Sequence, residues 1–413
     1  MKSRAFMAGR PLRVRVLNGI GRVLRWMGFP PGRRSAKSLM AAAVRLAGTD
    51  EWGDDSFLEG LQVLLQSLRE DSKLTYVGWF MLHEAIMRSL VNRLGIGQEL
   101  RQRPEVLDEE IRRPLFVTGL PRSGTTMLQG LLATDPGNRY LRAWEARYPV
   151  PAPTAETSDT DPRIAKAESS IHARRSLAPN LDAIHHMEAR APAECRWLLM
   201  TTFAFPNFSI FANLPRYREW LDGQDMVPVY AYYRRQLQLL QSRFRRERWL
   251  LKAPLHLHYL DSLLEVFPDA CIVQNHRDPL KAIPSLCSLV ATVQGFTRTR
   301  VRPGRLGYGC LTEMARAVEH AAAVRESLNG QQFYDVQYKD LVSDPIRTVR
   351  GIYERFGYDY SDVFEEGMHQ WLADNPQGKH GSHRYSLEQF NLDREQVMEH
   401  FSAYCERYGV SSQ

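Results

Sequence analysis

The sequence predicts an α/β fold in which a P-loop-containing parallel sheet is flanked by helices. The short apolar segment "PLFVTGL" (114–120) runs into a glycine-rich loop, and a helical pattern follows from about 124 to 134. Three further strand-like segments, "RWLLKAP", "ACIVQNHR" and "FYDVQYKDL", are separated by helical stretches. Strands that alternate with helices favour a parallel sheet covered on both faces.

Composition indicates an ordinary soluble globular protein. The chain has 413 residues, of which 44% are hydrophobic and 24% are charged, so it can bury a large core. Its five cysteines are widely spaced and form no CxxC pair, which favours buried thiols in a reducing cytoplasm over a structural zinc site. We therefore expect a cytoplasmic location.

The first predicted segment is a basic N-terminal arm, residues 1–35. Residues 1–40 hold ten Lys/Arg and no Asp/Glu, which leaves 44 basic and 47 acidic residues for the body and speaks against a nucleic-acid partner. Apolar residues recur in the arm at helical spacing: Leu12, Val16, Leu17, Ile20, Val23, Leu24 and Met27. Such a helix suits a membrane surface, but we favour packing on the body or on a second subunit. No apolar stretch reaches the length of a membrane span, and no signal peptide is evident.

Two further segments follow the arm. Residues 36–110 form a helical lead-in, and residues 111–413 form the P-loop domain. After a loop rich in Pro, Thr and Asp, this domain has a helical insertion at about 164–245 with many aromatic residues. Aromatic density of this kind is typical of core packing, although part of it could line an apolar acceptor pocket.

The glycine-rich loop "GLPRSGTT" (119–126) has the glycine spacing of a nucleotide-binding loop, but Thr125 stands where that loop has lysine. The first amides of the following helix would point at an anion, aided by the Arg122 charge. After the strand "RWLL" comes Lys252, where a nucleotide hydrolase would need a carboxylate for magnesium. Two cations without an evident metal ligand suit a group less charged than a terminal phosphate, such as a sulfuryl group.

A second anion element lies in "NHRDPLKAIPS" (275–285). Arg277 ends a strand and Ser285 lies about two helical turns further on, so both could face one phosphate. Taken alone, Asp278 and Pro279 indicate only an ordinary capped helix start.

Together with a later "YKDL", these two elements resemble the sulfotransferases that use 3′-phosphoadenosine-5′-phosphosulfate (PAPS). The similarity is greatest to a bacterial branch that is also similar to tyrosylprotein sulfotransferases, and it covers about residues 114–408. It implies transfer of a sulfuryl group from PAPS to a hydroxyl of an organic acceptor, with release of adenosine 3′,5′-bisphosphate (PAP) and no metal requirement.

The resemblance also implies roles for individual residues. The 5′-phosphosulfate falls to the loop residues Arg122, Ser123, Gly124, Thr125 and Thr126. The 3′-phosphate falls to Arg277 and Ser285, the adenine to Tyr338, and the transferring sulfuryl group to Lys252. A C-terminal segment that closes over the cofactor would add Arg384 and Tyr385.

The general base is not fixed by the resemblance. Our first hypothesis is Glu145 in "RAWEARYP", near the place where tyrosylprotein sulfotransferases carry their catalytic glutamate. His256 is an alternative, two positions beyond the histidine of cytosolic relatives, and the pair His185–His186 is another. Met127 also departs from those relatives, which place a tryptophan against the adenine.

Two rival functions remain open at this point. One is an ATP-dependent kinase with an atypical phosphate loop, and the other is a non-catalytic, membrane-peripheral nucleotide-binding protein that works through its arm. The acceptor, a small molecule or a lipid-like alcohol, is not specified by composition, and neither is assembly into a homo-oligomer.

Overall fold

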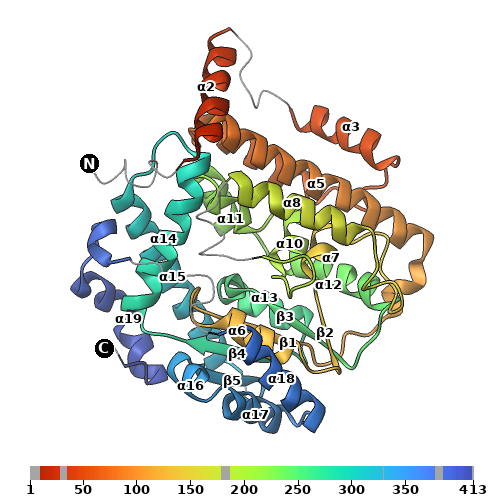
Figure 1. Cartoon of the computed structure of the whole chain (residues 1–413), viewed down its shortest axis with the longest axis vertical. Helices are drawn as coiled ribbons and strands as arrows, with labels where there is room; N and C mark the ends of the chain where they lie inside the picture. Colours follow the sequence, from red (N-terminus) through yellow and green to blue (C-terminus); the bar gives the residue numbers. More distant parts are fainter. Residues whose placement is uncertain (1–9, 28–34, 178–186, 329, 377–384, 412–413) are drawn as a thin grey trace.

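A five-stranded parallel sheet lies at the centre of the computed structural model (Figure 1). The structure describes residues 10–27, 35–177, 187–328, 330–376 and 385–411. The strands are β1 (Leu115–Gly119), β2 (Asn138–Tyr140), β3 (Arg248–Lys252), β4 (Cys271–His276) and β5 (Phe333–Gln337). Their spatial order is β2-β3-β1-β4-β5, and every pairing is parallel. The predicted α/β class is confirmed.

The N-terminal part of the chain supplies four helices and a 3-10 turn before the sheet begins. They are α2 (Leu12–Trp26), α3 (Ala36–Ala47), α4 (Leu58–Glu70), α5 (Tyr76–Gln102) and η1 (Pro104–Asp108). Side chains of Ser35 and Thr75 accept hydrogen bonds from backbone amides in the first turns of α3 and α5, which explains where both helices start.

The remaining helices fall into two groups, one around the sheet and one in the segment between β2 and β3. Around the sheet lie α6 (Thr125–Leu132), η4 (Pro254–Tyr259), α13 (Leu260–Val266), α14 (Pro279–Thr297), α15 (Pro303–Glu326), η5 (Gly330–Gln332), α16 (Tyr338–Ser343), α17 (Pro345–Phe356), α18 (Asp362–Asp374), η6 (Leu387–Phe390) and α19 (Arg394–Tyr408). Between β2 and β3 lie α7 (Ala143–Arg147), α8 (Arg163–Leu177), α10 (Arg196–Leu199), η2 (Met200–Thr202), η3 (Pro206–Ile210), α11 (Pro215–Asp222) and α12 (Val227–Gln241).

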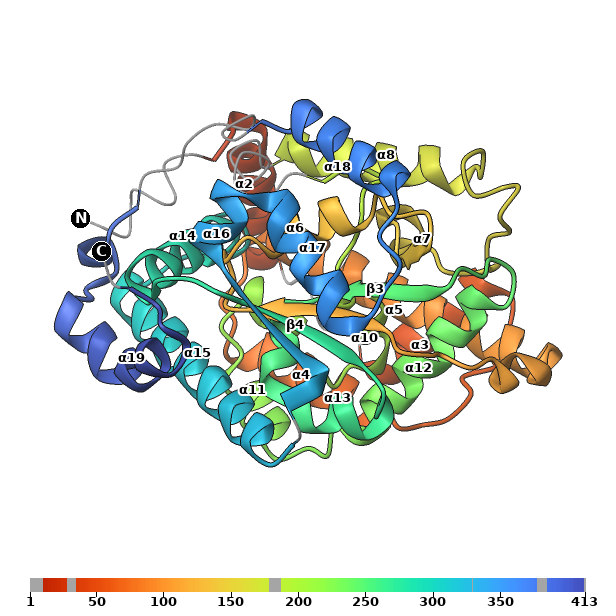
Figure 2. The same ribbon diagram turned by 90° about the horizontal axis from the view of Figure 1, so that it is seen from below.

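Each face of the sheet is buried by a different set of helices (Figure 2). Alternate residues of β1 point to opposite faces, so Leu115 and Val117 pack with α6, α17 and α18, whereas Phe116 joins a larger core. That larger core also includes side chains of α4, α5, α12 and α19. The lead-in and the insertion therefore share one core with the sheet, while the three-segment division of the chain stays a prediction.

Two details of the strands differ from the sequence-based expectation. The segment "FYDVQYKDL" is a strand only up to Gln337, and Tyr338 begins the short helix α16. The edge strand β2 is only three residues long and has no apolar run that could predict it.

The aromatic insertion is helical but broken into short pieces, and Phe203, Phe205 and Tyr230 are fully buried in the larger core.

Candidate functional site

The phosphate loop lies at the carboxyl end of β1, the central strand, between β3 and β4. Here the strand order reverses, which is where open parallel sheets bind ligands. Gly119 has a φ of 137°, and a Cβ there would lie 2.3 Å from the Asn275 carbonyl oxygen, so β4 approaches too closely for any side chain. Arg122 and Gly124 also have positive φ values of 73° and 89°. These conformations turn the chain directly into α6.

The two predicted anion elements meet at this loop. Arg122 donates from Nε to the Ser285 hydroxyl at 3.2 Å, and Arg277 donates from Nη1 to the Arg122 carbonyl oxygen at 2.5 Å. The Arg277 guanidinium lies 4.0 Å from the centre of the Tyr338 ring, which also packs against Gly124. Residues separated by more than 150 positions thus form one cluster. Within the described ranges, Arg277 has no carboxylate as an ion-pair partner.

The electrostatics of this cluster suit an anion. Burial and the neighbouring Arg277 charge lower the pKa of the Arg122 guanidinium, while Tyr385 and Tyr338 oppose that shift. Tyr385 of the C-terminal segment therefore lies close enough to interact with Arg122. An anion placed between the two guanidinium groups would relieve their mutual repulsion. The buried Ser123 hydroxyl has no hydrogen-bond partner among the described residues and adds an unused donor to the loop.

Arg277 directly follows His276, the last residue of β4, and several contacts fix the His276 ring. The His276 ring is hydrogen-bonded to Asp335 at 2.8 Å and to the Tyr404 hydroxyl at 3.1 Å, and it stacks on Tyr408 with ring centres 4.2 Å apart. Burial lowers the pKa of His276, although the Asp335 hydrogen bond opposes the shift. On the other side of Arg277, Asp278 caps α14 through the Leu280 amide, as expected. The end of β4 and the start of α14 together fix the backbone position of Arg277.

Lys252, at the carboxyl end of β3, lies between the phosphate loop and a carboxylate that the sequence did not reveal. Its Nζ is 2.9 Å from Glu194 Oε1 and 3.5 Å from the Thr126 hydroxyl, and its side chain is buried. The other Glu194 oxygen lies 2.9 Å from Arg196 Nε. Glu194 precedes α10 and is 58 positions from Lys252 in the chain, so no sequence spacing marks it.

Glu145, the predicted base, is fully buried in a different set of contacts. Its two oxygens accept hydrogen bonds from Arg139 at 2.6 and 3.1 Å, and Oε2 also accepts from the Arg142 amide at 3.0 Å. Arg139 is itself enclosed by the rings of Phe244 and Trp249. None of these partners lies in the phosphate loop, and none of them is Lys252. Through these hydrogen bonds Glu145 links α7 to β2.

His256 is also fully buried, on η4. Its Nδ1 is 2.8 Å from the Tyr230 hydroxyl, its Nε2 has no partner among the described residues, and the edge of Phe116 packs on the ring. Burial lowers the pKa of His256 to about 3, although the Glu194 charge opposes the shift. A base this weak accepts a proton poorly at neutral pH.

Arg384 and the His185–His186 pair lie outside the described residues.

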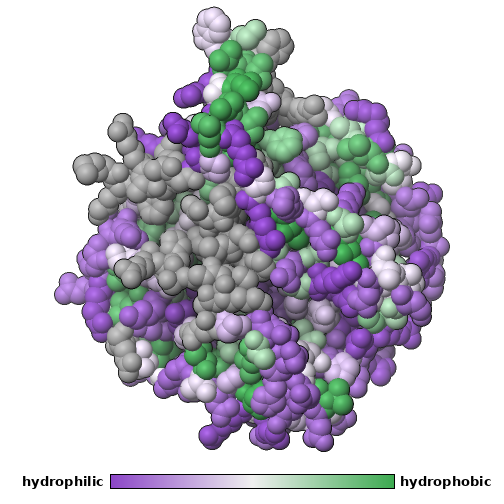
Figure 3. Space-filling model, viewed as in Figure 1, coloured by the Kyte–Doolittle hydropathy of each residue, from purple (hydrophilic) through white to green (hydrophobic). Residues whose placement is uncertain are grey.

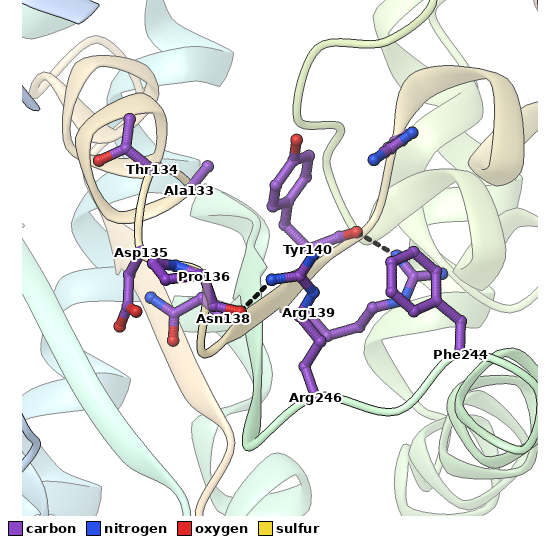
Figure 4. A pocket seen from close by; sticks show the side chains of 10 residues that line it. Ala133, Thr134, Asp135, Pro136, Asn138, Arg139, Tyr140, Phe244 and Arg246 are labelled. Carbon is purple, nitrogen blue, oxygen red and sulfur yellow. Dashed lines mark hydrogen bonds between the residues drawn. The ribbon is translucent and has the colours of Figure 1, made fainter. Parts of the chain in front are cut away.

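A cavity of about 260 Å³ lies away from this cluster, at the amino end of β2 (Figure 4). Asn138, Arg139 and Tyr140 of β2 line it, together with Phe244 and the carboxyl end of α6. The phosphate loop lies at the opposite end of α6. This cavity is therefore not part of the candidate site.

Cationic side chains and unpaired donors gather at the carboxyl end of β1, where they can attract an anion. The start of α6 lies beside Lys252, whose Nζ reaches the Thr126 hydroxyl, and the nearby Ser123 hydroxyl is buried. Arg277 and Ser285 both contact Arg122. In the part of the chain that the structure describes, no group of three or more His, Cys, Asp or Glu is placed to hold a metal ion.

Comparisons with known proteins identify the family of the chain. A family model described as the sulfotransferase family matches residues 114–362. Omega-hydroxy-beta-dihydromenaquinone-9 sulfotransferase Stf3, from Mycobacterium tuberculosis and Mycobacterium bovis, is 27% identical over 336 residues, which are 78% of this chain and 82% of that protein.

Two solved structures are similar over nearly the whole chain. Sulfotransferase STF1 from Mycobacterium tuberculosis H37Rv is 34% identical with a TM-score of 0.82, covering 90% of this chain and 100% of that one. Sulfotransferase STF9 from Mycobacterium avium is 30% identical with a TM-score of 0.85, covering 91% and 97%. The fold thus has counterparts among mycobacterial sulfotransferases.

Proposed function

This chain belongs to the sulfotransferase family, and from this premise we propose that PAPS is the donor from which it transfers a sulfuryl group to a hydroxyl. Sulfuryl transfer to a hydroxyl is the activity of the family. The identity of the donor is our proposal, and one observation supports it above all others. Arg277, Ser285 and Tyr338 meet the phosphate loop around Arg122, so that a second phosphate and an aromatic base can be bound beside the first.

The proposed roles of the binding residues follow from their positions. The loop amides of residues 123–126 and Arg122 would hold the 5′-phosphosulfate, because unpaired amides at a helix start attract anions. Arg277 and Ser285 would hold the 3′-phosphate, and Tyr338 would contact the adenine. Tyr385 lies close to Arg122 and would cover the phosphates from the C-terminal segment. Arg384 stays a prediction, since it falls outside the described residues.

Bound PAPS supplies an activated sulfuryl group whose bond to the 5′-phosphate breaks as the acceptor oxygen bonds to sulfur, so that PAP leaves with the bonding electrons. Lys252 would hold the sulfuryl oxygens, where negative charge must be balanced during transfer. Thr126 would orient the same group through its hydroxyl. The acceptor proton needs a base, and we now place Glu194 ahead of Glu145 for that role, since its carboxylate contacts Lys252.

For the acceptor we propose a lipid-like alcohol. The printed name of the Stf3 relative gives it a hydroxylated menaquinone as acceptor, which is an apolar molecule with one reactive hydroxyl. The aromatic insertion supplies the apolar surroundings that such a molecule needs, with Trp197 and Phe211 only half-buried at its edge. We also propose that the protein is cytoplasmic and that transfer from the donor needs no metal. None of the described helices combines the length and hydrophobicity of a membrane span.

A titration of the purified protein tests the donor. We expect PAP to bind without metal, with a dissociation constant that magnesium does not change, whereas ATP with magnesium binds at least about tenfold more weakly. Transfer of radiolabel from sulfur-labelled PAPS to a panel of phenols, sterols and long-chain alcohols then identifies the acceptor class. Tighter binding of ATP with magnesium than of PAP would overturn the proposal in favour of a kinase.

A further inference from the structure

Helix α2 points its apolar side away from the molecule. Five of the exposed hydrophobic residues in and directly after this helix form what we call the outer stripe: Leu12, Val16, Ile20, Val23 and Met27. These positions recur at steps of four, four, three and four, so they fall within about 80° of the helix circumference. Figure 3 shows hydrophobic side chains gathered along α2 at the top of the molecule. Val16, Ile20 and Val23 are each more than half exposed, at 52%, 52% and 55%.

Specific contacts on the opposite side hold α2 in this orientation. Val14 is fully buried, and the Asn18 side chain accepts a hydrogen bond from the Val77 amide at 3.0 Å. A Cβ on Gly21 would lie 2.2 Å from Tyr76 Cβ, so the helix packs closely on the start of α5. Arg10 donates to the Gly295 carbonyl oxygen at 2.7 Å. The described part of the arm therefore packs on the body, but through the side opposite the apolar pattern from which this packing was predicted.

The charges beside the outer stripe are all of one sign. Arg13 lies along one edge of the stripe, and Arg15 and Arg22 lie along the other, all three exposed. Residues 1–40 contain no acidic residue. Trp26, which is 87% exposed, lies at the edge of the stripe, where an aromatic ring can sit between an apolar and an aqueous phase. Basic residues that flank an apolar stripe are complementary to an acidic lipid surface.

We propose that α2 docks the protein on an anionic lipid bilayer. The outer stripe would lie at the boundary between headgroups and acyl chains, and the arginines would contact the headgroup phosphates. Arginines near such a surface are attracted to the acidic lipids. A symmetric contact between two copies of the stripe would instead bring arginines against arginines, because an isologous interface uses the same patch twice. No acidic residue of the arm could compensate that repulsion.

The docking surface is separate from the donor site. Helix α14 runs from the Arg277 cluster to the arm contact at Gly295, and the rise from Pro279 to Gly295 is roughly 24 Å. Substitutions on the outer stripe should therefore leave sulfuryl transfer to a water-soluble acceptor unchanged. This inference does not depend on the identity of the donor or of the acceptor.

Co-flotation of the full-length protein with lipid vesicles tests the inference. We expect the protein to float with acidic vesicles of phosphatidylcholine and phosphatidylglycerol, and less with neutral vesicles of phosphatidylcholine alone. The double substitution Val16→Glu/Ile20→Glu should reduce partitioning onto the acidic vesicles by at least about tenfold. The control is Val363→Glu on α18, because Val363 is 72% exposed and the substitution places a negative charge on an exposed helix position outside the stripe. It should partition like the wild type. Arg13→Gln/Arg22→Gln should weaken binding to the acidic vesicles alone.

Three outcomes would overturn the inference. The double variant could float as the wild type does, which would exclude the stripe. The wild type could bind both kinds of vesicle equally, which would exclude the role of the arginines. It could also stay unbound while sedimentation shows a dimer that Val16→Glu/Ile20→Glu dissociates, which would assign the stripe to a second copy of the chain. Unchanged turnover of a soluble acceptor confirms that each variant is folded.

Discussion

The role of a carboxylate in this protein depends on the cations that hold its oxygens. Glu145 is locked between Arg139 and the Arg142 amide, in a buried pair that links β2 to α7. Glu194 instead contacts Lys252, which also reaches Thr126 of the phosphate loop. We propose that the Glu145 pair serves the fold and that Glu194, beside the loop, receives the acceptor proton.

Glu194→Gln should therefore lower kcat by about 10²- to 10⁴-fold, the range for loss of a general base, while the dissociation constant of PAP changes little. Single-turnover transfer from PAPS measures the first quantity and calorimetry measures the second. Near-normal turnover of this variant would remove Glu194 from the mechanism.

Glu145→Gln is the matched substitution, and it should act on stability. It leaves the Arg139 guanidinium buried without a charge partner, at a cost of about 3–5 kcal/mol in the free energy of unfolding. Urea unfolding measures that cost, and turnover of the remaining folded enzyme should stay close to that of the wild type. A variant with wild-type stability and lost turnover would restore Glu145 as the base.

At the scale of elements, the phosphate loop depends on backbone conformations that only glycine adopts easily. Gly124 has a φ of 89°, and a Cβ there would lie 3.1 Å from both Leu341 and Tyr338. The missing side chain lets the Tyr338 ring, which we propose to contact the adenine, lie directly on the loop. Loop conformation and cofactor contact are thus coupled at one residue.

Gly124→Ala should lower the free energy of unfolding by about 1–2 kcal/mol, because a side chain at this φ is strained. It should also weaken PAP binding, since Tyr338 must move. Gly309→Ala is the control: Gly309 lies in α15, a Cβ there meets nothing within 4 Å, and the substitution should stabilise the protein by about 0.5–1 kcal/mol. Urea unfolding and PAP titration measure both effects, and wild-type behaviour of Gly124→Ala would contradict the coupling.

The sequence predicted elements well wherever local chemistry determined them. Strands β1, β3 and β4 are apolar runs buried on both faces, and the caps of α14 stand next to the helix in the chain. Strand β2 escaped prediction because three polar residues at a sheet edge carry no pattern. Tyr338 was assigned to a strand because an aromatic residue after β5 resembles its continuation, although the chain there turns into α16.

At the scale of the whole molecule, what could not be predicted was how distant segments meet. The phosphate loop and the Arg277 element were recognisable because each is a local motif, and the fold places them together. Glu194 was not recognisable, because its contact with Lys252 exists only after the insertion has packed on β3. The arm shows the same limit, since helical spacing predicted its amphipathic pattern but not that the apolar side would face outward.

The central claim is that one molecule with two phosphates bridges the loop and the Arg277 element. Calorimetric titration of PAP and of adenosine 5′-monophosphate, which lacks the 3′-phosphate, tests it most directly in the wild type and in Arg277→Gln. We predict that the wild type prefers PAP and that Arg277→Gln reduces this preference by about tenfold or more, with the affinity for the monophosphate nearly unchanged. An Arg277→Gln variant that keeps the full preference for PAP would contradict the account.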